Sequence, residues 1–156
     1  MDAGIRPYKP EDFEALYRLD QQCYAPGIAY SRRTLKWYLD LEGADCLLAE
    51  RDDAIAGFIV TARDGNLGHI ITLDVAEAQR RRGIGTALLA EAEARMMESG
   101  VRRMSLETAT DNLPAVAFWQ RHGYRTDAVL KNYYSDTLDA YEMCKMLSAK
   151  AQPRQT

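Results

Sequence analysis

The sequence has 156 residues and a formal net charge of −3, with 47% apolar and 28% charged residues. This length predicts one domain whose core needs no disulfide or metal, and the slight negative charge argues against a dedicated nucleic-acid or membrane-surface binder. The three cysteines (Cys23, Cys46 and Cys144) are scattered without metal-ligand spacing, so we expect reduced thiols, no metal site and a cytoplasmic location. We also expect no membrane segment, because no apolar run could span a bilayer.

The first elements in chain order are a strand and two helices. Residues 3–8 predict the strand, and residues 9–24 predict a helix with apolar side chains on one side. Residues 31–43 predict a second helix with Ser31 as its N-cap. The three apolar runs within residues 45–75 are separated by turn sequences, which predicts an antiparallel meander of three strands.

A strand–helix–strand unit follows the meander. Ile84, Leu88, Ala92 and Met96 would share one face of the helix, and residues 102–108 predict the next strand. Because such crossovers join parallel strands, we expect the two strands that flank this helix to be parallel.

The last part of the chain predicts a short helix and a strand pair. Residues 111–123 predict the helix, with Asp111 or Asn112 as its cap, and residues 124–130 and 139–147 predict the strands. The whole pattern indicates an α/β fold with a mixed sheet and helices on both faces.

The most informative stretch is Arg80-Arg81-Arg82-Gly83-Ile84-Gly85, which opens the longest predicted helix. A helix start carries unpaired N–H groups and partial positive charge, glycines let an anion approach the backbone, and arginines add donors. These features indicate a phosphate or pyrophosphate site, and the alternative is a tight turn with a solvated arginine run. Thr86-Ala87 excludes a P-loop, and Leu88 excludes a dinucleotide fingerprint, which needs Gly or Ala there.

The order of elements and several motifs resemble the GNAT superfamily of acyl-CoA-dependent N-acyltransferases. The matching features are the opening "IRPYKPEDF", the Arg/Gln-x-x-Gly-x-Gly/Ala signature at residues 80–85, Asn112 and "PAVAFWQRHGY" after the fifth strand, and "NYY" before the last hairpin. The resemblance implies a GNAT fold, with a mixed central sheet of about seven strands in which strands four and five are parallel and splayed.

The resemblance also implies acetyl-CoA as the cofactor. Backbone N–H groups from Arg81 to Thr86 would hold its pyrophosphate, and the main chain of Leu73 and Val75 would pair with the pantetheine arm like an added strand. Asn112 would reach the pantetheine from the other side, or would only cap its helix. The implied cofactor-binding residues are Leu73, Val75, Arg80, Arg81, Arg82, Gly83, Ile84, Gly85, Thr86, Asn112 and Trp119.

Trp119 departs from the family pattern, because many relatives carry a tyrosine there that protonates the departing thiolate. An indole N–H is no proton source near neutral pH, so either another tyrosine substitutes or the thiolate leaves unassisted. Trp119 would pack in the core of its helix or against the CoA arm. It also favours a third reading of the chain, a CoA-binding regulatory module without turnover.

Two residues are candidate bases for an amine that must lose a proton. Glu107 ends a strand in "LETATDN", a context similar to that of ribosomal-protein-alanine acetyltransferases, and its alternative is a solvated surface charge. His69 holds a strand position at which related N-terminal acetyltransferases carry an ionisable residue, and its alternative is a hydrogen-bonded core histidine. We expect a water between His69 and Glu107 to carry the proton.

Two sets of residues are candidates for acceptor binding. By the resemblance, Tyr133-Tyr134 would lie over the first residues of a peptide, although they could instead be sheet aromatics. The loop between the first two helices would form the opposite wall, with Tyr24, Ile28 and Tyr30 around a pocket for the first side chain.

The sequence therefore predicts acetyl transfer from acetyl-CoA to a primary amine, through a water-relayed general base. Near neutral pH, neutralising an α-amine costs about 1 kcal/mol and a lysine amine about 4 kcal/mol, which favours the N-terminus of a protein or peptide, such as a ribosomal protein. The alternative enzyme acetylates small-molecule amines. We expect the GNAT domain over residues 1–148, a polar tail over 149–156, no nucleic-acid or membrane partner, and either a monomer or a dimer.

Overall fold

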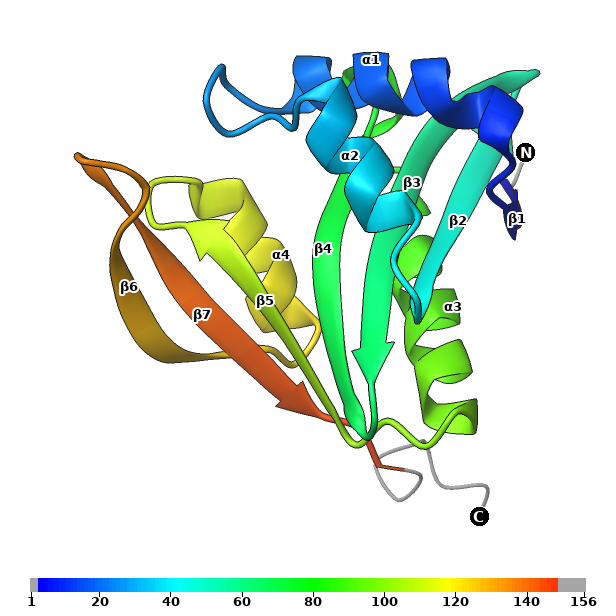
Figure 1. The fold of residues 1–156 in the computed structure, drawn as a ribbon. Coiled ribbons are helices and arrows are strands. Elements are labelled where there is room, and N and C mark those ends of the chain that lie inside the picture. The colour runs from blue at the N-terminus through cyan, green and yellow to red at the C-terminus, as the bar shows by residue number, and fades with distance from the viewer. Residues whose placement is uncertain (1–2, 149–156) are drawn as a thin grey trace. The chain divides into compact units, whose positions relative to one another are not determined.

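One mixed sheet of seven strands, in the order β1-β2-β3-β4-β5-β7-β6, organises the chain (Figure 1). The computed structural model describes residues 3–148, so the expected tail at 149–156 lies outside the described residues. The strands are β1 (Gly4–Pro7), β2 (Ala44–Arg51), β3 (Ala54–Asp64), β4 (Leu67–Val75), β5 (Arg103–Ala109), β6 (Arg125–Ser135) and β7 (Leu138–Met146). The helices are α1 (Phe13–Cys23), α2 (Arg32–Leu39), α3 (Ile84–Glu98) and α4 (Leu113–Arg121), with short 3₁₀ turns η1 (Pro10–Asp12) and η2 (Glu77–Gln79).

The chain divides into two compact units. The first unit contains residues 3–62 and 70–95, and the second contains residues 63–69 and 96–148. The single domain expected over residues 1–148 stays a prediction.

The first unit contains most of the predicted meander. β2 pairs antiparallel with β3, and β3 is the neighbour of β4 in the sheet. The N-terminal strand β1 pairs antiparallel with β2 at the edge of the sheet. Asp52 and Asp53 have φ values of 56° and 63°, which is the backbone of a tight hairpin turn that follows the twist of the strands. The helix α2 begins as predicted, because the Ser31 hydroxyl accepts the Thr34 N–H at 3.1 Å.

The core of the first unit joins α1 and α2 to the sheet. Leu16, Leu35, Leu48 and Phe58, one from each of these two helices and from β2 and β3, are 0% exposed. Burying each such side chain contributes roughly 1.5–3 kcal/mol. Figure 1 shows α2 in front of the β2–β3 part of the sheet and α3 behind it, so helices cover both faces as expected.

The helix α3 approaches β3 closely through Gly57. A Cβ added to Gly57 would lie 2.7 Å from the Asp74 carbonyl oxygen and 3.3 Å from the Ile84 side chain, so only glycine fits. Ile84, Leu88 and Ala92 are 0–3% exposed, which confirms the predicted apolar face of this helix. The start of α3 is therefore fixed on the core.

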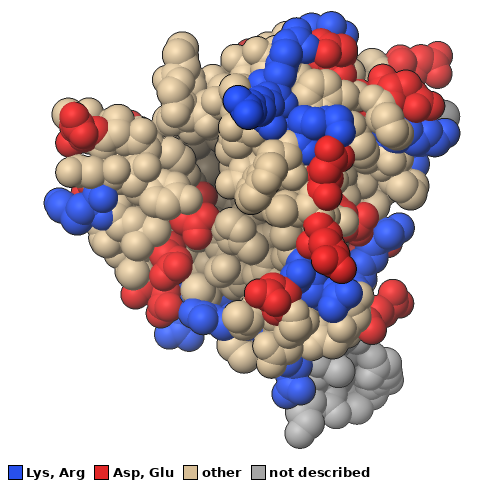
Figure 2. Space-filling model, in the orientation of Figure 1, with Lys and Arg blue, Asp and Glu red and all other residues tan. Residues whose placement is uncertain are grey.

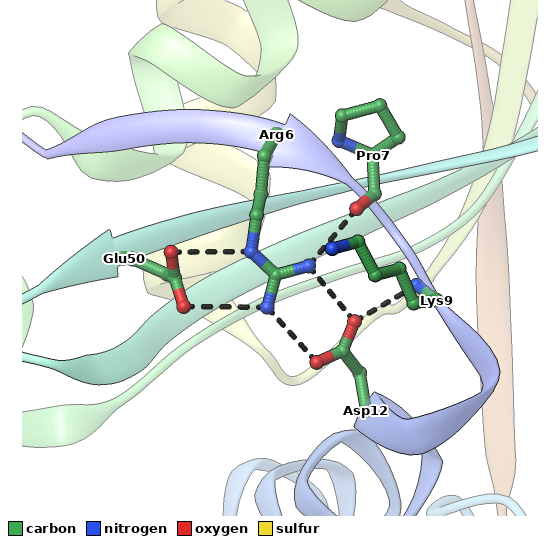
Figure 3. A network of polar contacts seen from close by, with 5 residues as sticks. All are labelled: Arg6, Pro7, Lys9, Asp12 and Glu50. Carbon is green, nitrogen blue, oxygen red and sulfur yellow. Dashed lines mark hydrogen bonds and ion pairs between the residues drawn. The ribbon is translucent and has the colours of Figure 1, made fainter.

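A polar network fastens the N-terminal strand to the rest of the first unit (Figure 3). The Arg6 guanidinium donates to both Asp12 oxygens at 2.9 Å and to Glu50 at 3.1–3.2 Å, while the Lys9 N–H donates to Asp12 at 2.8 Å. These bonds, above all those from Arg6, hold the pKa of Asp12 below its usual value.

The second unit contains the rest of the sheet and α4. β5 pairs with β7 and β7 with β6, both antiparallel, and the first residues of β4 pair in parallel with β5 (Leu67 with Arg103 to His69 with Ser105). That parallel ladder confirms the predicted crossover, and it ends at His69. Asn112, rather than Asp111, caps α4, because its side-chain oxygen accepts the Ala115 N–H at 3.2 Å.

The strand β6 is longer than the sequence predicted. The expected strand ended at residue 130, but β6 continues to Ser135 with an irregular register after Leu130. Asn132 adopts a φ of 56°, and its N–H donates to the Asp139 side chain at 2.8 Å. This left-handed residue, which Asn tolerates well, bends the strand without ending it.

Candidate active site

The start of α3 has the backbone of an anion cradle. Arg81 and Gly83 have φ values of 65° and 81°. For a non-glycine residue such a conformation costs roughly 1–2 kcal/mol, and residues of this kind gather at functional sites. The first helical bond runs from the Ala87 N–H to the Gly83 carbonyl at 2.9 Å, so the N–H groups of Ile84 and Gly85 precede the helical ladder.

The predicted cradle residues differ in what they expose. Arg81, Arg82, Gly83 and Thr86 are exposed and Gly85 is half-buried, while the Ile84 side chain is 3% exposed and belongs to the core. A Cβ added at Gly83 would meet nothing within 4 Å, so the space beside its backbone is open. An anion can therefore approach the main chain here, and Ile84 could contribute only its backbone N–H.

Arg80 has a contact within the chain that sequence reasoning missed. Its Nε donates to the Val75 carbonyl at 3.0 Å, and its Nη2 lies 3.6 Å from the Cys23 sulfur. Arg80 therefore ties the turn after β4 to the strand end and to α1. A contact between Arg80 and the pyrophosphate stays a prediction.

The β4 edge that was expected to carry the pantetheine arm is lined by side-chain donors. The Ala76 N–H donates to β3, so the main-chain groups of the alternating residues Ile71, Leu73 and Val75 point to the other side. The Tyr30 hydroxyl donates to the Ile71 carbonyl at 3.2 Å, and the Tyr24 hydroxyl donates to the Leu73 carbonyl at 3.0 Å.

These contacts place two of the three predicted pocket residues. Tyr24 and Tyr30 lie against β4 through their hydroxyls, while Ile28 is half-buried in the loop between them and its N–H donates to the Ala25 carbonyl at 3.0 Å. Burial raises the pKa of Tyr24 well above its usual value, so its hydroxyl stays a donor. The pocket for a first side chain remains a prediction.

The second unit brings the two candidate bases together. His69 Nε2 and Glu107 Oε1 are 2.7 Å apart, with side chains 39% and 18% exposed. The parallel register sets this contact, because His69 pairs with Ser105 and Glu107 follows on the same face. We expected a water between the two side chains, but these two atoms form a direct hydrogen bond, which leaves no room for it.

The geometry of this pair defines its chemistry. A carboxylate can only accept, so Nε2 carries the proton and the Nδ1 lone pair is the basic atom of the neutral ring. When Nδ1 takes a proton, the adjacent carboxylate stabilises the resulting imidazolium. The pair can therefore act as a general base.

Tyr134 contacts the same pair, because its hydroxyl donates to the Glu107 main-chain carbonyl at 3.3 Å. Burial raises the pKa of Tyr134, so the phenol stays protonated. Tyr133 stands edge-on to Tyr134 with ring centroids 4.9 Å apart, and it is 50% exposed. The tyrosine pair thus offers one anchored ring and one exposed ring beside Glu107.

Trp119 is a core residue of the second unit. It is 7% exposed, and its ring lies 5.1 Å from that of Phe118 and 5.4 Å from that of Tyr124. Of the two readings of Trp119, the structure supports packing within its helix. Asn112 caps the same helix, and a contact of either residue with the coenzyme stays a prediction.

The three cysteines are free, as the sequence predicted. The Cys23 sulfur lies 3.5 Å from the Val75 carbonyl, and burial raises the pKa of this thiol to about 11. Burial also raises the thiol pKa of Cys46 and of Cys144.

One hollow on the first unit is lined by none of the predicted site residues. A shallow hollow over η1, α1 and α2 is lined by Arg32, Arg33 and Lys36 together with acidic and apolar side chains. Basic and acidic side chains lie side by side near these helices at the top of Figure 2. Within residues 3–148, no group of side chains could hold a metal ion and no helix could cross a membrane.

Comparisons with known proteins show the family of the chain. Residues 13–124 match the model of the acetyltransferase (GNAT) family. A Methanocaldococcus jannaschii protein, named as an uncharacterized N-acetyltransferase, is 30% identical over 142 residues and 90% of each chain. An N-alpha-acetyltransferase of Sulfurisphaera tokodaii is 34% identical over 113 residues, which cover 64% of this chain and 68% of its own.

A solved structure has the same fold. The ribosomal-protein-S18-alanine N-acetyltransferase from Escherichia coli matches with a TM-score of 0.85 at 22% identity, over 97% of this chain and 99% of its own.

Proposed function

Because the chain belongs to the acetyltransferase (GNAT) family and is an acyl-transfer enzyme, we propose that it moves acetyl from acetyl-CoA to the N-terminal α-amine of a protein or peptide. Acetyl-CoA supplies the activated acetyl group when bound. The α-amine supplies the nucleophile, and the chain must remove its proton.

The observation that carries the proposal is the 2.7 Å contact between His69 and Glu107. In our proposal His69 Nδ1 accepts the proton of the amine, directly or through one water, and Glu107 holds the ring and stabilises its charge. Such a base contributes roughly 10²–10⁴ in rate. An α-amine, which titrates near pH 8, needs about 1 kcal/mol to become neutral and a lysine amine about 4 kcal/mol, so the α-amine is favoured by about 3 kcal/mol.

The start of α3 would hold the coenzyme. The exposed Arg81 and Arg82, the open backbone at Gly83 and the N–H groups of Ile84 and Gly85 fit a pyrophosphate in charge and in donors. The N–H groups of Leu73 and Val75, on the β4 edge, would donate to carbonyls of the pantetheine arm.

The acceptor is proposed from the tyrosines and from the relatives. The exposed ring of Tyr133 beside the anchored Tyr134 would lie over peptide backbone, and the loop with Tyr24, Ile28 and Tyr30 would contact the first side chain. The Sulfurisphaera tokodaii relative is named an N-alpha-acetyltransferase, which supports an α-amine acceptor.

A thiol-release assay with acetyl-CoA and a library of peptides that differ in their first residue tests the proposal. We expect mass spectrometry to find acetyl on the peptide N-terminus, and His69→Ala to lose that activity while acetyl-CoA still binds. Peptides with a blocked N-terminus and free lysines are the matched control. Turnover only on small amines, such as polyamines, would refute the α-amine assignment and support the small-molecule alternative.

A further inference from the structure

Two buried carboxyl groups meet inside the first unit. Asp20, on α1, is 0% exposed, and Asp74, on β4, is 1% exposed. One oxygen of each is satisfied: Asp20 Oδ2 accepts the Tyr30 N–H at 2.7 Å, and Asp74 Oδ1 accepts the Thr72 hydroxyl at 2.5 Å.

The other oxygen of each group, Asp20 Oδ1 and Asp74 Oδ2, is buried and receives no N–H or O–H donor from residues 3–148. Asp20 is a neighbour of Asp74 and raises the pKa of its carboxyl group. Carboxylates only accept, so a hydrogen bond between the two side chains requires a proton on one of them. Two adjacent buried carboxyls cannot both ionise.

The surroundings offer little compensation for a second negative charge. The titratable groups near Asp74 are Cys23 on α1, Tyr24 after it, Cys46 on β2 and Arg80 after β4. Burial raises the pKa of both thiols and of the phenol, so these three are neutral near pH 7. Arg80 is exposed and donates to the Val75 carbonyl.

The pair lies at the base of the loop between α1 and α2. Tyr30 is held twice, by its N–H to Asp20 and by its hydroxyl to the Ile71 carbonyl, and Tyr24 donates to the Leu73 carbonyl. Asp20 therefore connects the loop to Asp74, and Asp74 is part of the strand that receives both hydroxyls.

We propose that Asp20 and Asp74 share one proton at neutral pH, and that this pair positions the loop of residues 24–31 on β4. Since that loop is the proposed acceptor wall, the second half of the inference rests on the proposed function. Asp20 and Asp74 are positioning residues, because they act through Tyr24 and Tyr30.

The shared proton makes the stability of the folded chain decrease as the pH rises. Burial and then the bond from Asp20 raise the pKa of Asp74 well above its usual value. The folded chain therefore binds a proton that the unfolded chain releases, and stability falls as pH rises from the ordinary aspartate pKa of about 3.9 to the raised value. Within that window the unfolding constant of the native sequence should rise about tenfold per pH unit relative to a chain without the pair.

Urea unfolding of the full chain between pH 5 and 9 tests the shared proton. In Asp74→Asn the amide supplies the missing donor, so this variant should lose the tenfold-per-unit slope and be the more stable form at pH 8. Asp53→Asn, at an exposed turn, is the matched control and should keep the native slope. An Asp74→Asn curve parallel to that control would overturn the proposal, and so would the absence at pH 7 of an infrared protonated-carboxyl band that Asp74→Asn removes.

Asp74→Ala tests the positioning, because it removes the carboxyl group that neighbours the unsatisfied Asp20 Oδ1. Chymotrypsin should cut within residues 24–31 at least fivefold faster in Asp74→Ala, and Asp74→Asn should restore the native rate. The peptide KM should rise at least fivefold in Asp74→Ala, with the acetyl-CoA KM within twofold. An unchanged cleavage rate would overturn the positioning role of the pair. Faster cleavage with an unchanged peptide KM would refute only the acceptor role of the loop.

Discussion

Glu107→Gln is the sharpest test of the proposed base. Glutamine has the same shape and its amide oxygen can still accept the His69 Nε2–H at the observed 2.7 Å, so the ring should stay in place. What disappears is the negative charge that stabilises the imidazolium during proton transfer. The substitution therefore separates the electrostatic role of Glu107 from its role in holding the ring.

The expected size follows from the kind of hydrogen bond that is lost. A bond to a charged group contributes about 1.5–3 kcal/mol and a neutral bond about 0.5–1.5 kcal/mol, so the variant loses roughly 1–1.5 kcal/mol in the transition state. At about 1.4 kcal/mol per factor of ten, kcat should fall about five- to tenfold. Exposure of the His69 side chain, at 39%, places the effect at the lower end.

The assay is thiol release with acetyl-CoA and an acceptor peptide between pH 6 and 9. The kcat should be lower in Glu107→Gln across this range, while the Kd for acetyl-CoA should stay within twofold. Glu98→Gln, at the exposed end of α3, is the matched control. If both variants give the same rates and the same pH profile, Glu107 has no part in proton transfer.

Three further predictions concern the scaffold. Gly57→Ala should lower the free energy of unfolding by about 1–3 kcal/mol, because its Cβ would meet a β4 carbonyl at 2.7 Å, whereas Gly4→Ala, with nothing within 4 Å, should be neutral or slightly stabilising in the same urea titration. Asp12→Asn should lower the free energy of unfolding by about 1–3 kcal/mol at pH 7 and flatten the loss of stability below about pH 4. Because the pKa of Asp12 is lowered, the Arg6 bonds stabilise the fold above the ordinary aspartate pKa and are lost as acid protonates the carboxyl. An unchanged loss of stability in acid would contradict this. Trp119→Tyr should lower Tm more than it changes kcat, because Trp119 is 7% exposed in the core, and a several-fold higher kcat at unchanged Tm would instead show that a proton donor had been missing.

Features with a local physical cause could be predicted from the sequence. The Ser31 cap depends on a hydroxyl and an N–H three residues apart, and the buried face of α3 depends on the 3.6-residue period of Ile84, Leu88 and Ala92. The Gly-Ile-Gly stretch likewise indicated a turn at the start of α3, and Gly83 there has a left-handed backbone.

Features that depend on register could not be predicted. His69 and Glu107 were each identified, but their direct bond follows from the pairing of His69 with Ser105, which no local pattern fixes. The extension of β6 to Ser135 goes with the pairing of Ser135 with Leu138 and with the bond from the Asn132 N–H to Asp139, both of which follow from the register of the β6–β7 hairpin.

The buried carboxyl pair could not be predicted from the sequence. Asp74 shares its strand phase with Gly68, Ile70 and Thr72, whereas the more apolar phase contains Ile71, Leu73 and Val75, yet it is the phase of Asp74 that is buried. Its partner was not readable either, because Asp20 is far away in the chain and lies on a helix.

The raised thiol pKa values of Cys23, Cys46 and Cys144 slow the reaction of these cysteines with disulfide-exchange dyes. With a pKa of about 11, Cys23 is a thiolate in only roughly three molecules in ten thousand at pH 7.5, and the thiolate is the reactive form. Free coenzyme thiols, with an ordinary pKa near 8.5, react far faster at the same pH. A colorimetric readout should therefore follow coenzyme release with little background, and the enzyme should tolerate alkylating reagents without a protecting reductant.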